Sequence, residues 1–325
     1  MNLRRRDLLH LAAAAAALPT SSRLARAQTY PTRPVRIVAG FSPGSTTDII
    51  ARLIGRWLQE QLGQPVIVEN RPGAGGTIGA EAVVRAAPDG YTLLLAGSNN
   101  AINETLYDKL GYDFVRDIAP VALIDNVPNL VVVNPAFPAK TIPEFIAYAK
   151  ANPGKVNMGS AGNGTSSHLA GELFKMEAGV NLMHIPYRGQ PAALADLLAG
   201  QVQVSFAPTP PTIELVRAGK LRALAVTSAT RLEALPNVPT VAEFVPGYEA
   251  STWSGLGAPR NTPTAIVDKL NKVTNAGLAD SKLKATFTDM GGVVLGGSTG
   301  DFAKFIAAET QKWAKVIKFA GIKAE

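Results

Sequence analysis

The stretch GFSPGSTTDII at positions 40–50 and the stretch GSAGNGTSSHL at positions 159–169 follow one design. Each comes after a short apolar run, turns through glycine and hydroxyl residues, and opens into a helical pattern. A helix begins with backbone N–H groups that lack intrahelical partners, and its dipole favours negative charge there. One such corner alone is typical of a well-capped helix start. Two matched corners, neither containing lysine or cysteine, favour an anion held by backbone amides and hydroxyls.

Length and composition narrow the class of protein. The 325 residues suffice for two packed domains, and 46% hydrophobic with 18% charged residues is typical of a globular chain. The absence of cysteine excludes disulfides, thiolate metal sites and cysteine nucleophiles. Beyond the N-terminal segment, His168 and His184 are the only histidines, and their spacing is not that of metal ligands. We therefore expect no metal and no cofactor.

The N-terminus has the pattern of an export signal. Arginines at positions 4–6 precede an apolar stretch at 8–18, and Ala25-Arg26-Ala27 is an A-x-A cleavage pattern. The residues at 5–9 are similar to a twin-arginine signal, and a general secretory signal is the alternative. A membrane anchor is disfavoured because the apolar core is too short. We expect cleavage after Ala27 and a periplasmic protein.

Removal of residues 1–27 also changes the charge balance. The net charge of +7 falls to about +3, because that segment holds five arginines and one aspartate. No lysine- and arginine-rich segment remains, so nucleic-acid binding is not expected. A modest positive potential still favours a small anion.

Apolar runs alternate with helical periodicity along the rest of the chain. The predicted strands cover 35–40, 65–69, 91–96, 156–159, 183–187, 202–206 and 221–227. The predicted helices cover 48–62, 77–87, 167–178, 191–198, 213–218 and most of 263–323. The proline-broken segment 118–134 is interpreted as the passage between two domains. This order predicts two α/β units with mostly parallel sheets and both corners at one cleft.

Enzyme motifs are incomplete in this sequence. The first corner lacks the lysine of a P-loop. The segment Gly73–Gly79 follows a strand and opens a helix, but its third glycine comes one place late for dinucleotide binding. Neither Ser98 nor Ser160 lies in a G-x-S-x-G motif. The sequence therefore predicts a binding protein, with an exported enzyme as the weaker alternative.

Four charged or titratable residues near the corners have expected roles. Arg188 either pairs with a second carboxylate through a forked hydrogen bond or is solvated at the surface. His168, one turn into the second corner's helix, is expected near the ligand, and His184 is expected to be structural. Asp48 is expected to complement the first helix dipole or to tie down the corner.

Several longer motifs carry a family resemblance. In order they are YPTRPVRIVAGFSPGSTTDIIAR, VENRPGAGGTIGAE, PDGYTLL, GSAGNGTSSHLAGELF, HIPYRGQPAALADLLAGQV, LPNVPTVAE and KWAKVIKFAGIK. Together they span the mature chain. The sequence resembles the Bug-type (TctC-like) periplasmic solute-binding proteins of tripartite tricarboxylate transporters.

The resemblance implies a fold and a function. The fold is the α/β, two-domain, type II periplasmic-binding-protein (Venus-flytrap) architecture, with a central mixed sheet in each domain and a ligand cleft at the hinge. Domain 1 is expected at 28–126 and 250–325, and domain 2 at 127–249. The implied ligand is a di- or tricarboxylate, an acidic amino acid or an aromatic acid. The protein is expected to be a monomer. Its implied partners are transporter membrane subunits, or a membrane-bound sensor kinase.

The resemblance also implies ligand contacts from both corners and from nearby strand ends. The expected residues are Phe41, Ser42, Gly44, Ser45, Thr46, Ser98, Asn99, Ser160, Gly162, Asn163, Thr165, His168, Tyr187, Arg188, Gly189 and Pro208. Two departures from the family pattern stand out. Gln203 replaces a usual aspartate, which bears on the cleft wall near Phe206–Pro208, and Ser45 replaces the second glycine of PGG.

Overall fold

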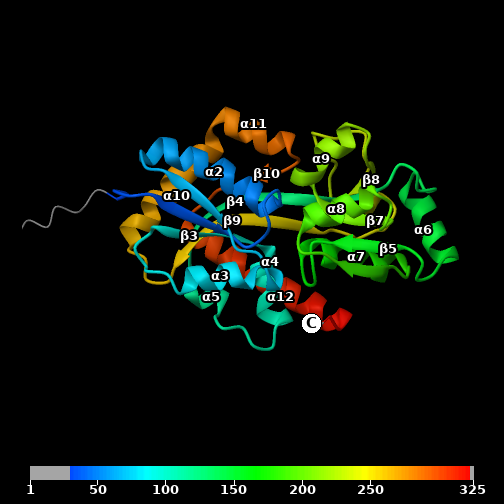
Figure 1. The fold of residues 1–325 in the computed structure, drawn as a ribbon, viewed down its shortest axis with the longest axis horizontal. Coiled ribbons are helices and arrows are strands. Elements are labelled where there is room, and N and C mark those ends of the chain that lie inside the picture. The colour runs from blue at the N-terminus through cyan, green and yellow to red at the C-terminus, as the bar shows by residue number, and fades with distance from the viewer. Residues whose placement is uncertain (1–29, 323–325) are drawn as a thin grey trace, which may run out of the picture. The chain divides into compact units, whose positions relative to one another are not determined.

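The computed structural model of this protein describes residues 30–322, and the expected export signal at 1–27 lies outside them. From Arg33 onward the chain forms one compact unit, drawn in Figure 1. No helix among the described residues has the length and apolar character needed to cross a membrane.

One half of the sheet follows the first predicted α/β unit. The predicted strands at 35–40, 65–69 and 91–96 are confirmed, and they pair in parallel because helices connect them. A strand from the C-terminal part of the chain then joins antiparallel to β3. In spatial order the strands are β2 (Val66–Asn70), β1 (Val35–Ala39), β3 (Thr92–Gly97), β9 (Ser251–Pro259) and β4 (Ile118–Val133).

The strand β4 belongs to both halves of the sheet. Its residues 118–128 pair antiparallel with β9, and its residues 129–133 pair antiparallel with two strands of the second half. The segment predicted as a proline-broken passage is therefore one continuous strand. Its register against β9 shifts beside Pro120, whose nitrogen has no hydrogen to donate to the neighbouring strand. The expectation of mostly parallel sheets was wrong, because β4 and β9 make both halves mixed.

The second half of the sheet confirms the remaining predicted strands. Its parallel strands are joined by helices, as in the first half. The strands are β7 (Val204–Pro208), β8 (Arg222–Val226), β5 (Asn157–Ser160) and β6 (Met183–Pro186), and the short β10 (Val293–Val294) pairs with β4. Figure 1 shows β4 and β9 running from the side of α2 and α3 to the side of α7 and α8.

Most of the predicted helices are present, and side chains cap the starts of some of them, such as Ser45 before α2 and Ser298 before α12. The five predicted before position 220 are confirmed as α2 (Thr46–Leu62), α3 (Thr77–Val84), α7 (Ser166–Ala178), α8 (Gln190–Leu198) and α9 (Thr209–Arg217). The tail forms α10 (Thr264–Ala279), α11 (Ser281–Asp289) and α12 (Thr299–Ala320). Three further helices were not predicted: α4 (Ser98–Leu106), α5 (Phe114–Asp117) and α6 (Ile142–Ala151). Short 3₁₀ turns occupy Ala74–Gly76 and Val241–Glu243.

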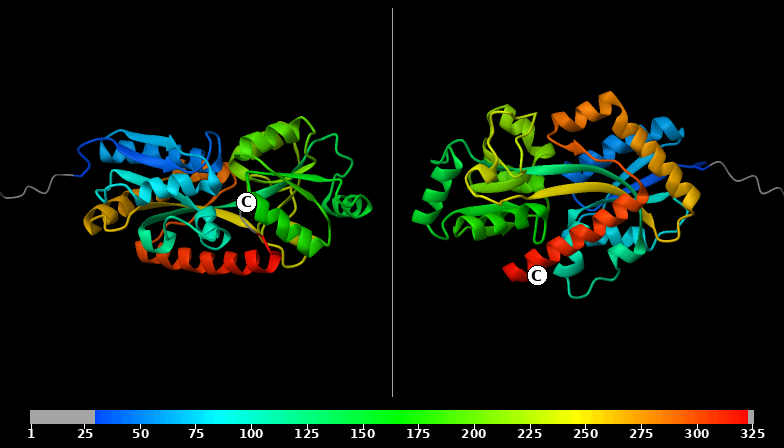
Figure 2. Two further views of the ribbon diagram at one scale, coloured as in Figure 1. Left: turned by 60° about the horizontal axis from the view of Figure 1, so that its bottom comes forward. Right: turned by 180° about the vertical axis from the view of Figure 1, so that it is seen from behind.

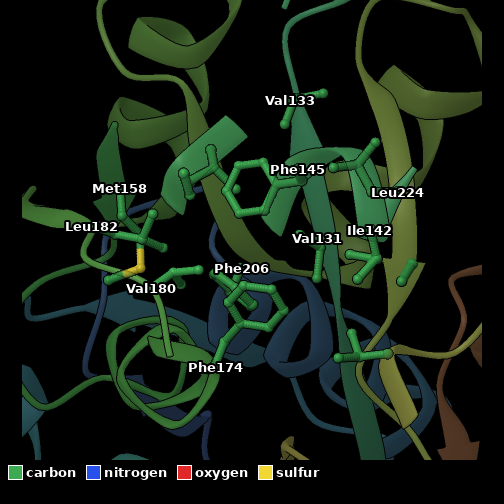
Figure 3. Packing of buried hydrophobic residues seen from close by; sticks show 14 of the residues in the cluster. Val131, Val133, Ile142, Phe145, Met158, Phe174, Val180, Leu182, Phe206 and Leu224 are labelled. Atoms are coloured by element: carbon green, nitrogen blue, oxygen red, sulfur yellow. The ribbon is translucent and has the colours of Figure 1, made fainter. Parts of the chain in front are cut away.

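Apolar side chains gather in separate cores. One core draws only on residues 131–250 and contains the fully buried Phe145, Phe174 and Phe206 (Figure 3). Another core draws on residues 38–123 and 253–306, with Trp253 packed edge-on against Phe302. The exact domain boundaries given above stay a prediction.

A third apolar cluster joins elements that the two larger cores keep apart. It contains Ile102 and Leu106 of α4, Leu169 of α7, and Trp313 and Ile317 of α12. Figure 2 shows α12, in red, crossing alongside α4. This cluster lies next to the second corner, since a Cβ atom added at Gly164 would overlap Leu106.

Candidate functional site

The first corner is held by the side chains of its own helix start. Ser45 caps α2 by accepting a hydrogen bond from the Asp48 amide (3.4 Å). Asp48 accepts from the Gly44 amide (2.9 Å) and pairs with Arg52 (2.8 Å). Burial acts to raise the pKa of Asp48, but the hydrogen bonds from Arg52 and Gly44 outweigh it and lower the pKa. The structure thus shows Asp48 tying down the corner, as expected.

The second corner is held in a similar way. The Thr165 hydroxyl donates to the Gly162 carbonyl (2.7 Å), and Ser167 accepts from the Ala161 amide (3.0 Å). The Gly164 amide donates to Nδ1 of His168 (3.1 Å). Because these side chains satisfy the loop amides, the corner keeps its shape without using the first-turn amides of α7.

A pair of stacked histidines supports the second corner from behind. The rings of His168 and His184 lie 3.7 Å apart and nearly parallel, at 6°. Since Nδ1 of His168 accepts from Gly164, the proton of His168 lies on Nε2, which faces Glu172 at 3.5 Å. Nε2 of His184 lies 2.6 Å from the Ser160 hydroxyl.

The pKa shifts around this pair match a structural role. Burial, together with the neighbouring His168, lowers the pKa of His184 to about 4. Burial acts to raise the pKa of Glu172, but its hydrogen bonds with His168 and Lys175 lower it to about 2. Glu172 is therefore an anion that fixes the histidine ring rather than a group that exchanges protons.

Between the two corners lies a small cavity of about 60 Å³, which we call the corner cavity. Five helices begin at it: α2, α4, α7, α8 and α9, the last capped by Pro208. Its lining contains no ionisable side chain among the described residues. The lining residues are Phe41, Ser45, Thr46, Thr47, Gly97, Asn99, Ala161, Thr165, Ser166, Ser167, Gln190, Pro208, Thr252, Trp253 and Ser254.

A second cavity adjoins the first and shares Phe41 and Ala161 with it; we call it the outer cavity. It has a volume of about 620 Å³, and Arg188 is the one charged side chain of its lining in the described chain. Arg188 is exposed and makes no ion pair with the residues described. The other lining residues are Phe41, Ser42, Pro72, Gly73, Ala74, Gly75, Gly76, Tyr107, Ala161, Gly162, Asn163, Pro186 and Tyr187.

Eleven of the sixteen predicted site residues line these cavities. The corner cavity contains Phe41, Ser45, Thr46, Asn99, Thr165 and Pro208. The outer cavity adds Ser42, Gly162, Asn163, Tyr187 and Arg188. The remaining five, which line neither cavity, are Gly44, Ser98, Ser160, His168 and Gly189.

Four of these five residues are buried behind the cavity walls, and Gly44 is exposed. Ser98 is fully buried and hydrogen-bonded to the hydroxyl of Thr252. Gly189 has φ of 143°, and a Cβ atom there would come within 2.5 Å of the Ser42 hydroxyl, so glycine permits close approach of the first corner to the start of α8. Ser160 and His168 hold the second corner, as described above, and Gly44 supplies the amide that Asp48 binds.

Sequence reasoning missed three parts of the lining. Thr252, Trp253 and Ser254 come from β9, where no motif marks the strand. The glycine turn at 73–76 was weighed only as a dinucleotide motif, and Asn99 and Asn103 of α4 in fact hold it by donating to the Gly75 carbonyl. Gln190 was missed although it follows Gly189 directly at a helix start, which is the signal that could have identified it.

Gln203 lies away from both cavities. It precedes β7, at the opposite end of that strand from Pro208. Its side chain accepts from the Asn157 amide (2.9 Å) and donates to the Gly200 carbonyl (3.2 Å), which links β5 to β7. The substitution therefore bears on sheet structure and not on the cleft wall.

Comparison with known proteins assigns the family. The model for the tripartite tricarboxylate transporter family receptor (TctC) matches residues 50–322. The chain belongs to this family. The receptor is 38% identical to protein BugT of Bordetella pertussis over 318 residues, which cover 97% of this chain and 96% of BugT.

Solved structures of relatives share the fold. The R. palustris protein Rpa4515 with adipate has a TM-score of 0.89 at 39% identity, covering 90% of this chain and 99% of that one. MatC from Rhodopseudomonas palustris with bound malate has a TM-score of 0.84 at 34% identity, covering 89% and 100%. The receptor therefore has the two-domain fold of periplasmic binding proteins, as the resemblance implied. Among the described residues no group of three or more histidine and acidic side chains could hold a metal ion.

A fully buried carboxyl group lies next to one residue of the corner cavity's wall. Asp125 of β4 pairs across the sheet with Ser254, which lines the cavity. Burial raises the pKa of Asp125 to about 7, and Ser254 offsets only part of this effect. Between about pH 4 and pH 7, Asp125 of the folded receptor therefore holds a proton that the unfolded chain, with an aspartate pKa near 3.9, releases.

We predict that Asp125→Asn stabilises the receptor in a pH-dependent way. Because the folded-state pKa is raised, the wild-type loses stability as the pH rises from about 4 to about 7 and stays low above that. The free energy of unfolding of the variant should exceed that of the wild-type by roughly 2–4 kcal/mol at pH 8 and by little at pH 4. Denaturant titrations at both pH values measure this.

Asp268→Asn, at an exposed position of α10, is the matched control and should change stability equally little at both pH values. A gain for Asp125→Asn that is the same at pH 4 and pH 8 would contradict the assignment of the raised pKa to this carboxyl.

Proposed function

We propose that this receptor binds a small dicarboxylate between its two corners in the periplasm and delivers it to the membrane subunits of a tripartite tricarboxylate transporter. One carboxylate lies in the corner cavity and the other in the outer cavity. The family supports the transport role, and two relatives were solved with adipate and with malate, both dicarboxylates.

The observation that carries this proposal is the set of five helix starts around a cavity without ionisable side chains. Each helix start carries about half a positive charge, and those of α2, α4 and α7 present more backbone amides than those of α8 and α9, whose first turns contain Pro191, Pro210 and Pro211. Ser and Thr hydroxyls of both corners add further donors. A carboxylate can therefore exchange its water for neutral donors from both sides, with no competing acidic side chain in the wall.

Closure of the cleft follows from this arrangement. The amides of α2 and α7 belong to different halves of the sheet, so they converge on one ligand only when the corners come together. A ligand that gains contacts from both halves stabilises the closed form by that difference in binding free energy. The closed form is then the one that the membrane subunits recognise.

The pairing of Ser160 with His184 raises an enzymatic alternative, and the geometry favours binding instead. The two atoms are within hydrogen-bond distance, as in a nucleophile–base pair. However, Ser160 is fully buried and lines neither cavity. A histidine with a pKa of about 4 is also a weak base at neutral pH. We infer that the ligand is released unchanged.

The test is a ligand screen of mature receptor that has been unfolded, washed and refolded to remove carried-over ligand. Aliphatic dicarboxylates should raise the melting temperature, and the corresponding diamides should not, because helix starts stabilise negative charge. At 100 times its dissociation constant, a ligand specific for the folded state adds about 2.7 kcal/mol. Stabilisation by the diamides but not by the acids would contradict the proposal.

We predict that Arg188→Ala weakens dicarboxylate binding selectively. Loss of a charge-assisted hydrogen bond in the outer cavity should lower the affinity for a dicarboxylate about tenfold. The affinity for the corresponding monocarboxylate should not change, because its single carboxylate occupies the corner cavity. Isothermal titration calorimetry measures both.

Arg217→Ala is the control, since Arg217 pairs with Glu214 on α9 and lines neither cavity. Equal losses for mono- and dicarboxylates in Arg188→Ala, or no loss for either, would remove Arg188 from the site.

A further inference from the structure

Gln190 stands out among the residues of the corner cavity. It is the first residue of α8, only 2% of it is exposed, and it lines the cavity between the two corners. Glycine at 189, with φ of 143°, turns the chain into the helix and sets the position of Gln190. A long polar side chain buried at this place needs hydrogen-bond partners for both ends of its amide.

The hydrogen-bond network fixes which way the Gln190 amide is turned. The Ser205 hydroxyl donates to the Gly159 carbonyl (2.8 Å), so its only hydrogen is already used. Ser205 must then accept from Gln190, which presents Nε2 to it at 3.1 Å. The carbonyl oxygen Oε1 is therefore the end that remains, and it has no hydrogen-bond partner among the described residues.

Oε1 of Gln190 is an acceptor without a partner beside this cavity. The other polar groups of the wall are helix-start amides, which only donate, hydroxyls, which donate or accept, and the Asn99 side chain, whose Nδ2 donates to the Gly75 carbonyl; Oγ1 of Thr46 also has no partner within the described chain. A carboxylate satisfies donors but offers no hydrogen to Oε1. A buried acceptor left unsatisfied costs free energy, so a ligand that brings a donor to Oε1 gains affinity over one that does not.

We propose that Gln190 is a specificity-determining residue whose Oε1 accepts a hydrogen bond from a hydroxyl next to the ligand's carboxylate. This inference rests on the proposed function. The ligand class then narrows from dicarboxylates to 2-hydroxydicarboxylates.

The donor is a hydroxyl and not an ammonium group. No carboxylate side chain lines the corner cavity in the described chain, and the positive ends of five helices point to it. Asp125 lies on β4 beside Ser254 in the sheet and does not line the cavity. A desolvated ammonium would therefore lack a counter-charge, whereas a neutral hydroxyl pairs with Oε1 at no such cost.

Calorimetry on matched ligands tests this. The probes are butanedioate, pentanedioate and hexanedioate, each with and without a 2-hydroxyl group, and the 2-amino compounds complete the series. We expect the wild-type to bind the hydroxy acid of at least one pair ten times or more tighter than its unsubstituted partner. The amino acids should bind more weakly than the hydroxy acids.

Gln190→Met keeps the length of the side chain but removes the acceptor, and the hydroxyl preference should fall to about one while binding of the unsubstituted acid persists. Gln201→Met is the matched control, because it makes the same substitution at an exposed glutamine that lines neither cavity; it should keep the preference. Both variants are checked by circular dichroism and melting temperature.

The outcomes separate the two claims. Equal binding of hydroxy and unsubstituted acids by the wild-type would overturn the role of Gln190 and leave carboxylate binding standing; this comparison needs no variant. A preference that survives in a folded Gln190→Met would overturn it as well. Binding of none of the acids would overturn the proposed function and the inference together.

Discussion

The first-turn amides of a helix cannot be satisfied inside that helix, and the site of this receptor is built on that constraint. Five helices begin at one cavity, and at the two corners the neighbouring loop amides are already paired with side chains. Asp48 serves the first corner and His168 serves the second. The helix-start amides are thereby left for a ligand, and the anion is recognised without a cationic side chain in the corner cavity.

Buried polar groups hold this arrangement in place. Glu172 orients His168, whose ring stacks on His184, and His184 in turn meets Ser160. Asp125, beside Ser254 in the sheet, has a raised pKa. Such groups lower the stability of the fold unless they are paired or protonated. Behind the cavity walls, the hydrogen bonds between them offset this cost and fix the position of the second corner.

Local sequence patterns predicted the parts of the structure that depend on local physics. The two corners, their helices and the buried strands follow from glycine, capping residues and apolar runs, and all of these elements were found. The helix Ser98–Leu106 was missed because its residues SNNAINETL carry little apolar periodicity. Buried Asn100 binds the Gly97 amide at the start of its own helix, and buried Asn103 holds the distant glycine turn at 73–76. The family resemblance added the two-domain fold.

The missed site residues depend on contacts that are distant in sequence. Thr252–Ser254 reach the cavity because β9 pairs with both β3 and β4, and no local pattern announces that pairing. Gln190 gains its meaning from Ser205 and Gly159, which come from two other strands. Conversely, His168 and Ser160 were placed in the site by their position in the motif, whereas their side chains turn to the rear of the corner.

The most direct test of the account is a crystal structure of the receptor with a bound dicarboxylate. The account predicts that oxygens of one carboxylate lie within hydrogen-bond distance of first-turn amides of both α2 and α7, with no cationic side chain touching that group. A carboxylate held by one corner only, or one held chiefly by Arg188 with the corner cavity unused, would contradict it.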